Sequence, residues 1–330
     1  MSQSPGSCFV IGRTLLIALI LGHGPAAIQA AEAQSASAAN RSELTFVTSK
    51  DGTRIGVECA GTGPTLLFVH GGVGDRTRWT PMFPLLTSQL TVCAMDRRGR
   101  GASGDSPEYS LQKEAEDVAA VVNSHSGSSF VFGHSYGAVA ALEAAFLTDR
   151  IAKLMLYEPP LHEPVRNNLA VAARLEEMIS KGELEQALLT FQSEIVKQSP
   201  EEIARMKVRP TWAALVASIA VHPRQMRALS AYRFDASRMK SMTTPTLLLI
   251  GEETASPYAK ESVNALRESL PNATVAVLER QQHNAMDGAR DVLSKAIIKF
   301  LQQSAPLESV ANDAAIADIF LHESIEVRRE

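Results

Sequence analysis

The sequence predicts an α/β fold in which a mostly parallel central sheet is flanked by helices on both faces. Two observations predict it: short apolar runs without polar alternation, and helix-like segments between those runs. Runs of this kind are typical of strands that are buried on both faces. The apolar runs are Thr65 to Val69, Val92 to Met95, Phe130 to Phe132, Leu154 to Tyr157, Thr246 to Ile250 and Thr274 to Leu278. The helix-like segments include Leu111 to Asn123, Ala138 to Leu147, Tyr258 to Ser269 and Val292 to Gln302.

The predicted sheet opens with an antiparallel hairpin. Leu44 to Thr48 and Ile55 to Cys59 read as strands on either side of a turn at Lys50 to Thr53. The Asp-Gly pair inside that turn is a strong hairpin signal. A hairpin followed by alternating strands and helices predicts a mixed sheet.

The strand signal disappears between Glu158 and Thr244, where the pattern becomes helical. Apolar residues recur there at one-turn spacing, namely at Leu184, Ala187, Leu188 and Phe191. Ser199 to Glu202 forms a capping box with proline at the first helical position. We therefore expect a helical lid inserted into a two-part core. The expected parts are a core of residues 42–158, a lid of residues 159–243, a core of residues 244–304 and a tail of residues 305–330.

Residues 1–33 have the order of a secretory signal peptide. Arg13 precedes the apolar run Thr14 to Leu21, and small residues follow, with an A-x-A cleavage site at Ala31 to Ala33. The apolar run is much shorter than the about 20 residues that a spanning helix needs. We therefore expect export to the periplasm or the medium, and no integral membrane span after cleavage.

Composition narrows the class of protein further. Of 330 residues, 45% are hydrophobic and 21% are charged, which is typical of a folded soluble protein. The net charge is −4, and no basic run occurs. Binding of nucleic acid needs clustered cations, so we expect no nucleic-acid partner.

The cysteines leave one question open. Cys8 would leave with the signal peptide, so Cys59 and Cys93 remain, in strands predicted to be neighbours. Export permits a disulfide between them. We favour two buried thiols, because disulfides between adjacent strands are uncommon. No Cys or His spacing suggests a metal site, and we expect no metal.

A nucleophile motif stands between the third apolar run and the helix that follows it. Gly133 to Gly137 reads Gly-His-Ser-Tyr-Gly, which is G-x-S-x-G between a strand and a helix. A tight turn there forces the Ser135 side chain outward, and the glycines let strand and helix approach closely. The N-terminus of the helix supplies amide donors for an anion.

On these residues the sequence resembles the serine hydrolases of the α/β-hydrolase fold family. His70-Gly71-Gly72 follows a buried strand, as the oxyanion loop of that family does. The resemblance implies that the N–H groups of Gly72 and Tyr136 form the oxyanion hole. Asp96 to Ser103 is similar to the family's D-x-R-G-x-G-x-S stretch, which we interpret as a structural loop beside the site.

The resemblance also implies a base and an acid. His283 follows the last strand and matches the family's catalytic base in position. The family places its acid, usually Asp, after the strand that follows the lid, where this chain has Glu252 and Glu253. We favour Glu253 because of its offset, with Glu252 as its neighbour and Glu158, before the lid, as the main rival. In a third interpretation the triad is incomplete.

Other residues have weaker signals. We interpret His134 as packing and His70 as a hydrogen-bonded anchor of its loop. Large side chains could line a substrate pocket beneath the lid, with Trp212 the candidate for substrate contact. The others are Trp79, Met206 and Tyr232.

The predicted function is hydrolysis of an ester or a related carbonyl bond of a small molecule, with Ser135 as nucleophile and His283 as general acid and base. Such a reaction needs no cofactor. The fold hosts related chemistries, so a thioesterase, a lactonase, a carbon–carbon bond hydrolase and a cofactor-free haloperoxidase stay open. A non-enzymatic ligand-binding or interaction protein with an incomplete triad is the alternative from another class. The sequence leaves the natural substrate and the oligomeric state open.

Overall fold

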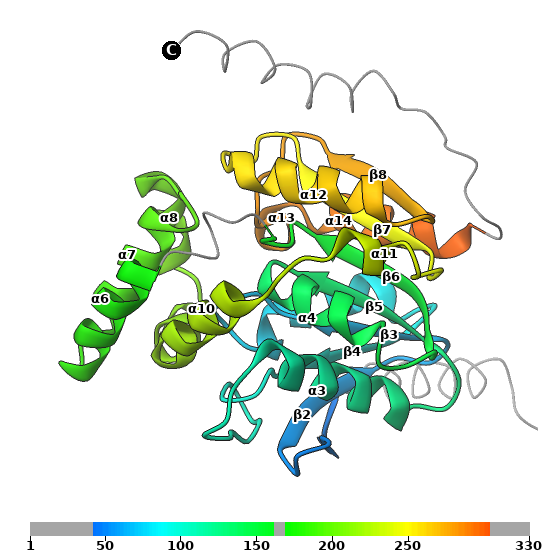
Figure 1. The fold of residues 1–330 in the computed structure, drawn as a ribbon, viewed down its shortest axis with the longest axis horizontal. Helices are drawn as coiled ribbons and strands as arrows, with labels where there is room; N and C mark the ends of the chain where they lie inside the picture. Colours follow the sequence, from blue (N-terminus) through cyan, green and yellow to red (C-terminus); the bar gives the residue numbers. More distant parts are fainter. Residues whose placement is uncertain (1–41, 162–168, 304–330) are drawn as a thin grey trace, which may run out of the picture. The chain divides into compact units, whose positions relative to one another are not determined.

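A computed structural model of the protein describes residues 42–161 and 169–303 (Figure 1). Within them, eight strands form one sheet in the order β1-β2-β4-β3-β5-β6-β7-β8. The strands are β1 (Glu43–Thr48), β2 (Arg54–Ala60), β3 (Thr65–Val69), β4 (Thr91–Met95), β5 (Ser129–His134), β6 (Ile151–Tyr157), β7 (Thr246–Gly251) and β8 (Ala273–Leu278). Strand β2 pairs antiparallel with β1 and β4, and the remaining pairs are parallel. The predicted mostly parallel sheet is confirmed.

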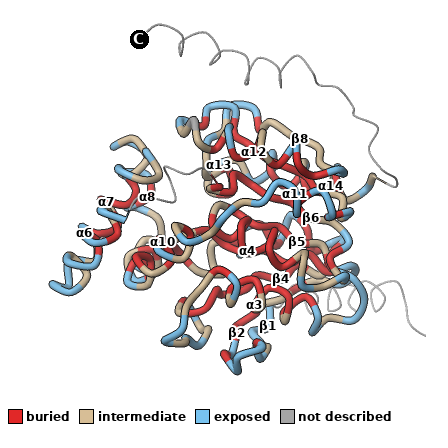
Figure 2. Tube along the Cα trace, viewed as in Figure 1, coloured by how far each residue is buried: buried red, intermediate tan, exposed pale blue. Residues whose placement is uncertain are grey.

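Helices cover both faces of this sheet. Its central strands are therefore buried on both faces and are apolar along their whole length. One face packs on α3 (Leu111–Ser124), α4 (Tyr136–Ala144) and α12 (Pro257–Ser269), as Figure 1 shows. The other packs on η1 (Arg76–Met82), α2 (Phe83–Leu86) and α14 (Arg290–Gln302). Figure 2 shows the central strands and α4 buried. The core therefore holds the carboxyl ends of the parallel strands at one edge, where loops carry functional side chains.

Between β6 and β7 the described chain is helical. The elements are α6 (Leu169–Ser180), α7 (Leu184–Glu194), α8 (Pro200–Lys207), α9 (Trp212–Ser218), η2 (Ile219–Val221), α10 (His222–Ala231) and α11 (Ala236–Met239). The capping box at the start of α8 is confirmed, since Ser199 and Glu202 bond to each other's backbone. Helices α6 to α10 share an apolar cluster, which also includes Val73 of the loop after β3, and we call these helices the lid.

The preference for free thiols was wrong. Cys59 on β2 lies directly opposite Cys93 on β4 in the antiparallel register, and the two form a disulfide. Their Cα atoms are 4.1 Å apart, which brings the side chains within bonding reach. The sequence did not reveal this register. His125 lies beside them, but the two sulfurs bind each other and so offer no free ligands to a metal.

Two predicted segments, the signal peptide of residues 1–33 and the tail of residues 305–330, lie outside the described residues. Across residues 42–161 and 169–303, the helices are all too short or too polar to cross a membrane. Helix α13 (Ala285–Gly288), between β8 and α14, completes the described elements.

Candidate functional site

The turn after β5 carries Ser135 in a strained conformation. Ser135 has φ 52° and ψ −125°, a region that L-residues rarely adopt, and α4 begins at the next residue. A Cβ at Gly133 would lie 2.5 Å from the Cα of Ala138, and a Cβ at Gly137 would overlap the carbonyl of His70. Glycine is therefore required on both sides, and the serine hydroxyl stands at the sheet edge.

The loop after β3 brings Gly72 to the same place. Gly72, Ser135 and Tyr136 line one cavity. His70 anchors this loop, because its Nε2 accepts the N–H of Arg97 at 3.1 Å. That contact leaves the proton on Nδ1, which donates to the carbonyl of Gly71 at 2.9 Å. Burial and the nearby Arg97 lower the pKa of His70 well below its usual value, so the ring is neutral.

The loops after β6 and β8 bring a carboxylate to an imidazole. Nδ1 of His283 lies 2.6 Å from Oε2 of Glu158. The second oxygen, Oε1, accepts the backbone N–H of Gly251 at 2.8 Å and the hydroxyl of Thr254 at 2.5 Å. Glu158 is only 2% exposed and has φ 46°. The carboxylate is therefore held in one orientation, with one oxygen free for the imidazole.

Glu253, the favoured acid, does not take this position. Its side chain is exposed and lines a separate polar hollow with Arg280. Glu252 is also exposed, and its carboxylate accepts the backbone N–H of Arg280 at 2.7 Å. The expectation for Glu253 is corrected in favour of Glu158, because the loop after β7 turns both of its glutamates outward.

The cavity above these residues has a volume of about 110 Å³. It is lined by Ser135, Glu158 and His283 and by apolar side chains from the lid, namely Phe191, Ile195, Val196, Met226 and Leu229. Trp212 is not among the described lining residues. It packs in the lid cluster with Lys207 above its ring, so the expectation that it contacts substrate is corrected.

The other large side chains named from the sequence belong to cores or to surface packing. Trp79 stacks on Phe68, with ring centroids 4.6 Å apart. Met206 is buried in the lid cluster, and the hydroxyl of Tyr232 donates to Glu143 at 2.8 Å. The positions of these residues in the sequence did not reveal which side chains would face the cavity.

His134 lies beneath His283 and positions its backbone. Its Nε2 lies 2.9 Å from the carbonyl of His283, and the two ring centroids are 4.7 Å apart. Burial lowers the pKa of His134 well below its usual value, so it is neutral and Nε2 donates to that carbonyl. Its contacts match the predicted packing role.

Sequence reasoning missed three contributors to the site. Thr254 bonds the buried carboxylate, as described above. His222 and Gln225, from α10, line the cavity, and Nδ1 of His222 lies 3.2 Å from the carbonyl of Gly72. Burial and Arg100 lower the pKa of His222 to about 3, so it is neutral. No motif distinguishes these residues, since each acts through a contact with a distant loop.

A family model, a curated relative and two of the solved structures that match this chain are all of hydrolases. Residues 66–296 match the model of the "Alpha/beta hydrolase family". The chain is 25% identical over 255 residues to 2-(acetamidomethylene)succinate hydrolase of Mesorhizobium japonicum, covering 73% of this chain and 89% of that protein.

Solved structures agree on the fold. An alpha/beta hydrolase from Sphaerobacter thermophilus superposes with a TM-score of 0.69 and 32% identity, over 78% of this chain and all (100%) of that one. A thermophilic esterase from Thermogutta terrifontis has a TM-score of 0.63 and 23% identity, over 79% of this chain and 98% of that one. At this identity the second match supports the fold alone.

Proposed function

Because the chain belongs to the alpha/beta hydrolase family, we propose that it is a serine hydrolase that cleaves an ester or a related carbonyl bond. The observation that carries this proposal is the Glu158–His283 contact of 2.6 Å at the cavity that Ser135 lines. A buried carboxylate paired with His283 at this cavity argues against the non-enzymatic alternative, for which the atypical acid was the only sequence feature.

In the first step, the Ser135 hydroxyl attacks the carbonyl carbon while Nε2 of His283 takes its proton. The new oxygen–carbon bond gives a tetrahedral intermediate whose negative charge falls on the former carbonyl oxygen. Glu158, on the opposite nitrogen, holds the ring orientation and stabilises the imidazolium. The N–H groups of Gly72 and Tyr136 bind the oxyanion.

The intermediate then collapses to an acyl-enzyme. The carbon–oxygen bond to the alcohol breaks, and His283 returns its proton to the departing alkoxide. Water next attacks the acyl carbon, again giving its proton to His283, and the ester bond to Ser135 breaks. The acid leaves and the hydroxyl is restored, so protons and electrons balance without a cofactor.

The cavity supports a small acyl group as substrate. Its lining is mainly apolar on the lid side, where Phe191, Met226 and Leu229 lie. Its volume of about 110 Å³ is small for a long acyl chain. We therefore expect short-chain esters to be cleaved faster than long-chain ones.

Labelling with a fluorophosphonate probe tests the proposal. The parent protein is expected to bind the probe covalently, and Ser135→Ala is expected to lose the label. Ser256→Ala, which removes another hydroxyl lining the same cavity, is the matched control and should keep it. Absence of Ser135-dependent labelling would contradict the proposed nucleophile.

A substrate panel then separates the chemistries. Turnover of p-nitrophenyl acetate, p-nitrophenyl palmitate, a lactone and a thioester would be compared for the parent and Ser135→Ala. Ser135-dependent turnover that is highest for the short ester supports the esterase proposal. Turnover confined to the lactone or the thioester would reassign the substrate class while keeping the nucleophile.

A further inference from the structure

A buried arginine contacts the back of the oxyanion loop. Arg97 follows β4 and is 1% exposed. Its Nη1 donates to the carbonyl oxygen of Gly71 at 2.6 Å. That carbonyl belongs to the same peptide group as the N–H of Gly72, and in a planar trans peptide the two point in opposite directions. The arginine therefore contacts one end of the group whose other end is the proposed oxyanion donor.

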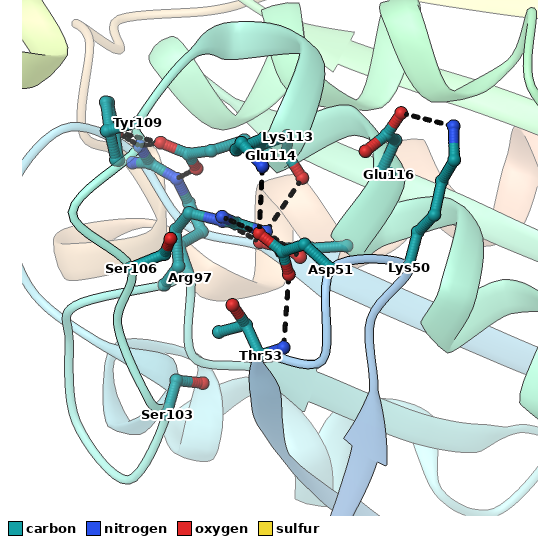
Figure 3. A network of polar contacts seen from close by, with 12 residues as sticks. Lys50, Asp51, Thr53, Arg97, Ser103, Ser106, Tyr109, Lys113, Glu114 and Glu116 are labelled. Carbon is teal, nitrogen blue, oxygen red and sulfur yellow. Dashed lines mark hydrogen bonds and ion pairs between the residues drawn. The ribbon is translucent and has the colours of Figure 1, made fainter.

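The guanidinium is fixed in place by further contacts. Nε and Nη2 of Arg97 reach the two oxygens of Glu114, at 2.5 and 2.7 Å, and the ring of Tyr136 lies 4.3 Å from its central carbon. Figure 3 shows Arg97 beside Glu114 and Tyr109. Nη2 also donates to the amide oxygen of Gln225 at 2.6 Å. Because Glu114, Gln225 and the ring of Tyr136 hold the guanidinium, its Nη1 stays directed at the Gly71 carbonyl.

The buried charged groups behind this loop, Arg97, Arg100 and Glu114, carry more positive than negative charge. Arg100, also buried, donates to the carbonyl of Gly72 at 3.0 Å and to Gln225 at 2.8 Å. Its hydrogen-bond acceptors among the described residues are neutral oxygens, whereas Glu114 balances Arg97. Burial lowers the pKa of Arg100, but an arginine side chain stays protonated in proteins. The excess positive charge behind the Gly71–Gly72 loop therefore favours a negative charge that develops on the cavity side of the loop.

We propose that Arg97 is a positioning residue that orients and polarises the Gly71–Gly72 peptide, so that the N–H of Gly72 binds the tetrahedral oxyanion more strongly. The inference rests on the proposed serine hydrolysis. Hydrogen bonds in a chain strengthen one another at low dielectric. Because the oxyanion exists only in the transition state and the intermediate, the effect falls on kcat and not on KM.

The neighbouring residue is a matched control. Arg98 is 0% exposed and pairs with Asp117 on α3, as Arg97 pairs with Glu114 on the same helix. Its hydrogen bonds go to Asp117, Asp51 and the carbonyl of Lys113, all on the side of the β1–β2 hairpin and α3. Removing either guanidinium thus takes the ion-pair partner from a buried carboxylate, but of these two arginines only Arg97 contacts the proposed oxyanion loop.

The test compares Arg97→Met with Arg98→Met below the Tm of both variants. We expect Arg97→Met to lower kcat for p-nitrophenyl acetate by about tenfold to hundredfold, because one oxyanion donor is worth about a hundredfold or more. KM should change by less than about threefold. Arg98→Met should lower Tm to a similar extent and keep kcat within about threefold. Equal losses of kcat in the two variants would overturn the proposal.

A boronic acid gives a second readout that a purely structural role would not move. Benzeneboronic acid forms a tetrahedral anion on a catalytic serine and so places negative charge near the oxyanion hole. Its affinity should fall in Arg97→Met by the same factor as kcat/KM, and stay near the parent value in Arg98→Met. Unchanged boronate affinity in Arg97→Met would contradict the polarisation of Gly72.

Should Arg97→Met fail to fold, Arg97→Lys serves in its place. A lysine keeps the charge but lacks the fork that reaches Glu114 and Gly71 together. We expect an intermediate loss of kcat and of boronate affinity, and parent-like values of both would overturn the proposal. A parent that fails to react with fluorophosphonate would refute the hydrolase itself, which is a different outcome from an active parent insensitive to Arg97.

Discussion

The ends of β6 and β7 lie side by side and carry the same residue type, yet they play different parts. After β6, Glu158 turns inward at positive φ and meets His283. After β7, Glu252 and Glu253 turn outward. The loop after β7 instead supplies two donors, the N–H of Gly251 and the hydroxyl of Thr254, to the carboxylate from β6.

This difference shows that the orientation of a buried carboxylate is set by its hydrogen-bond partners as well as by its position along the chain. A buried carboxylate is stable only where donors satisfy it. The loop after β7 has those donors and directs them toward β6. The end of β6 therefore provides the carboxylate, and the loop after β7 provides its two hydrogen-bond donors, the N–H of Gly251 and the hydroxyl of Thr254. We call these two donors the cage. Separate substitutions distinguish the two contributions.

The largest expected effect comes from removing the charge. Glu158→Gln should lower kcat by about 10³- to 10⁴-fold, because the amide favours the wrong histidine tautomer and no longer stabilises the imidazolium. Glu253→Gln is the matched control and should stay within about twofold. Steady-state kinetics on p-nitrophenyl acetate measures both. A collapse of kcat in Glu253→Gln alone would restore the assignment made from the sequence.

The next effect comes from displacing the cage. A Cβ at Gly251 would overlap the carbonyl of Gln281 and lie 2.8 Å from the Oγ1 of Thr254. Gly251→Ala should therefore shift the loop, with kcat falling by about tenfold or more and the free energy of unfolding by about 1–3 kcal/mol. Gly288→Ala, which meets nothing within 4 Å, is the control for the glycine change itself. Similar results for both variants would show that the loop after β7 does not hold the carboxylate.

A smaller effect is expected from one donor of the cage. Thr254→Val removes the hydroxyl that bonds Oε1 of Glu158 and keeps the shape of the side chain. A hydrogen bond to a charged group is worth about 1.5–3 kcal/mol, so kcat should fall by about tenfold, while Thr254→Ser should retain most of it. Kinetics of the pair provides the check, and equal losses would attribute the effect to packing.

The smallest effect concerns pH and the histidine beneath the site. Because burial lowers the pKa of His134 in the folded protein, the unfolded chain binds a proton near pH 6.5 that the folded one does not. The free energy of unfolding should thus fall as pH drops below about 6.5, by about 1.4 kcal/mol per pH unit for this group. Urea denaturation of the parent and His134→Phe at pH 7.5 and 5.5 measures it. The variant should show a shallower pH dependence, and identical slopes would exclude His134 as the source.

Much of the fold followed from local signals in the sequence. The strands and the Gly133–Gly137 turn depend on apolar runs and glycine positions that can be read within a few residues. The acid could not be read this way, because Glu158 depends on Gly251 and Thr254, about ninety residues away in the chain. The disulfide escaped for a similar reason, since only the register of β2 and β4 places Cys59 opposite Cys93.

Helix α10 joins the wall of the cavity to the loop that carries Gly72, which bears on any redesign of the lid. His222 and Gln225 lie in the wall of the cavity. His222 also contacts the carbonyl of Gly72, and Gln225 accepts hydrogen bonds from Arg97 and Arg100. Exchanging the whole lid for that of another hydrolase would thus remove part of the support of the Gly72 loop. Transplants that end before α10 leave those contacts intact, but they still remove Ser218 of α9, whose hydroxyl accepts the N–H of Gly74 in the same loop at 2.6 Å.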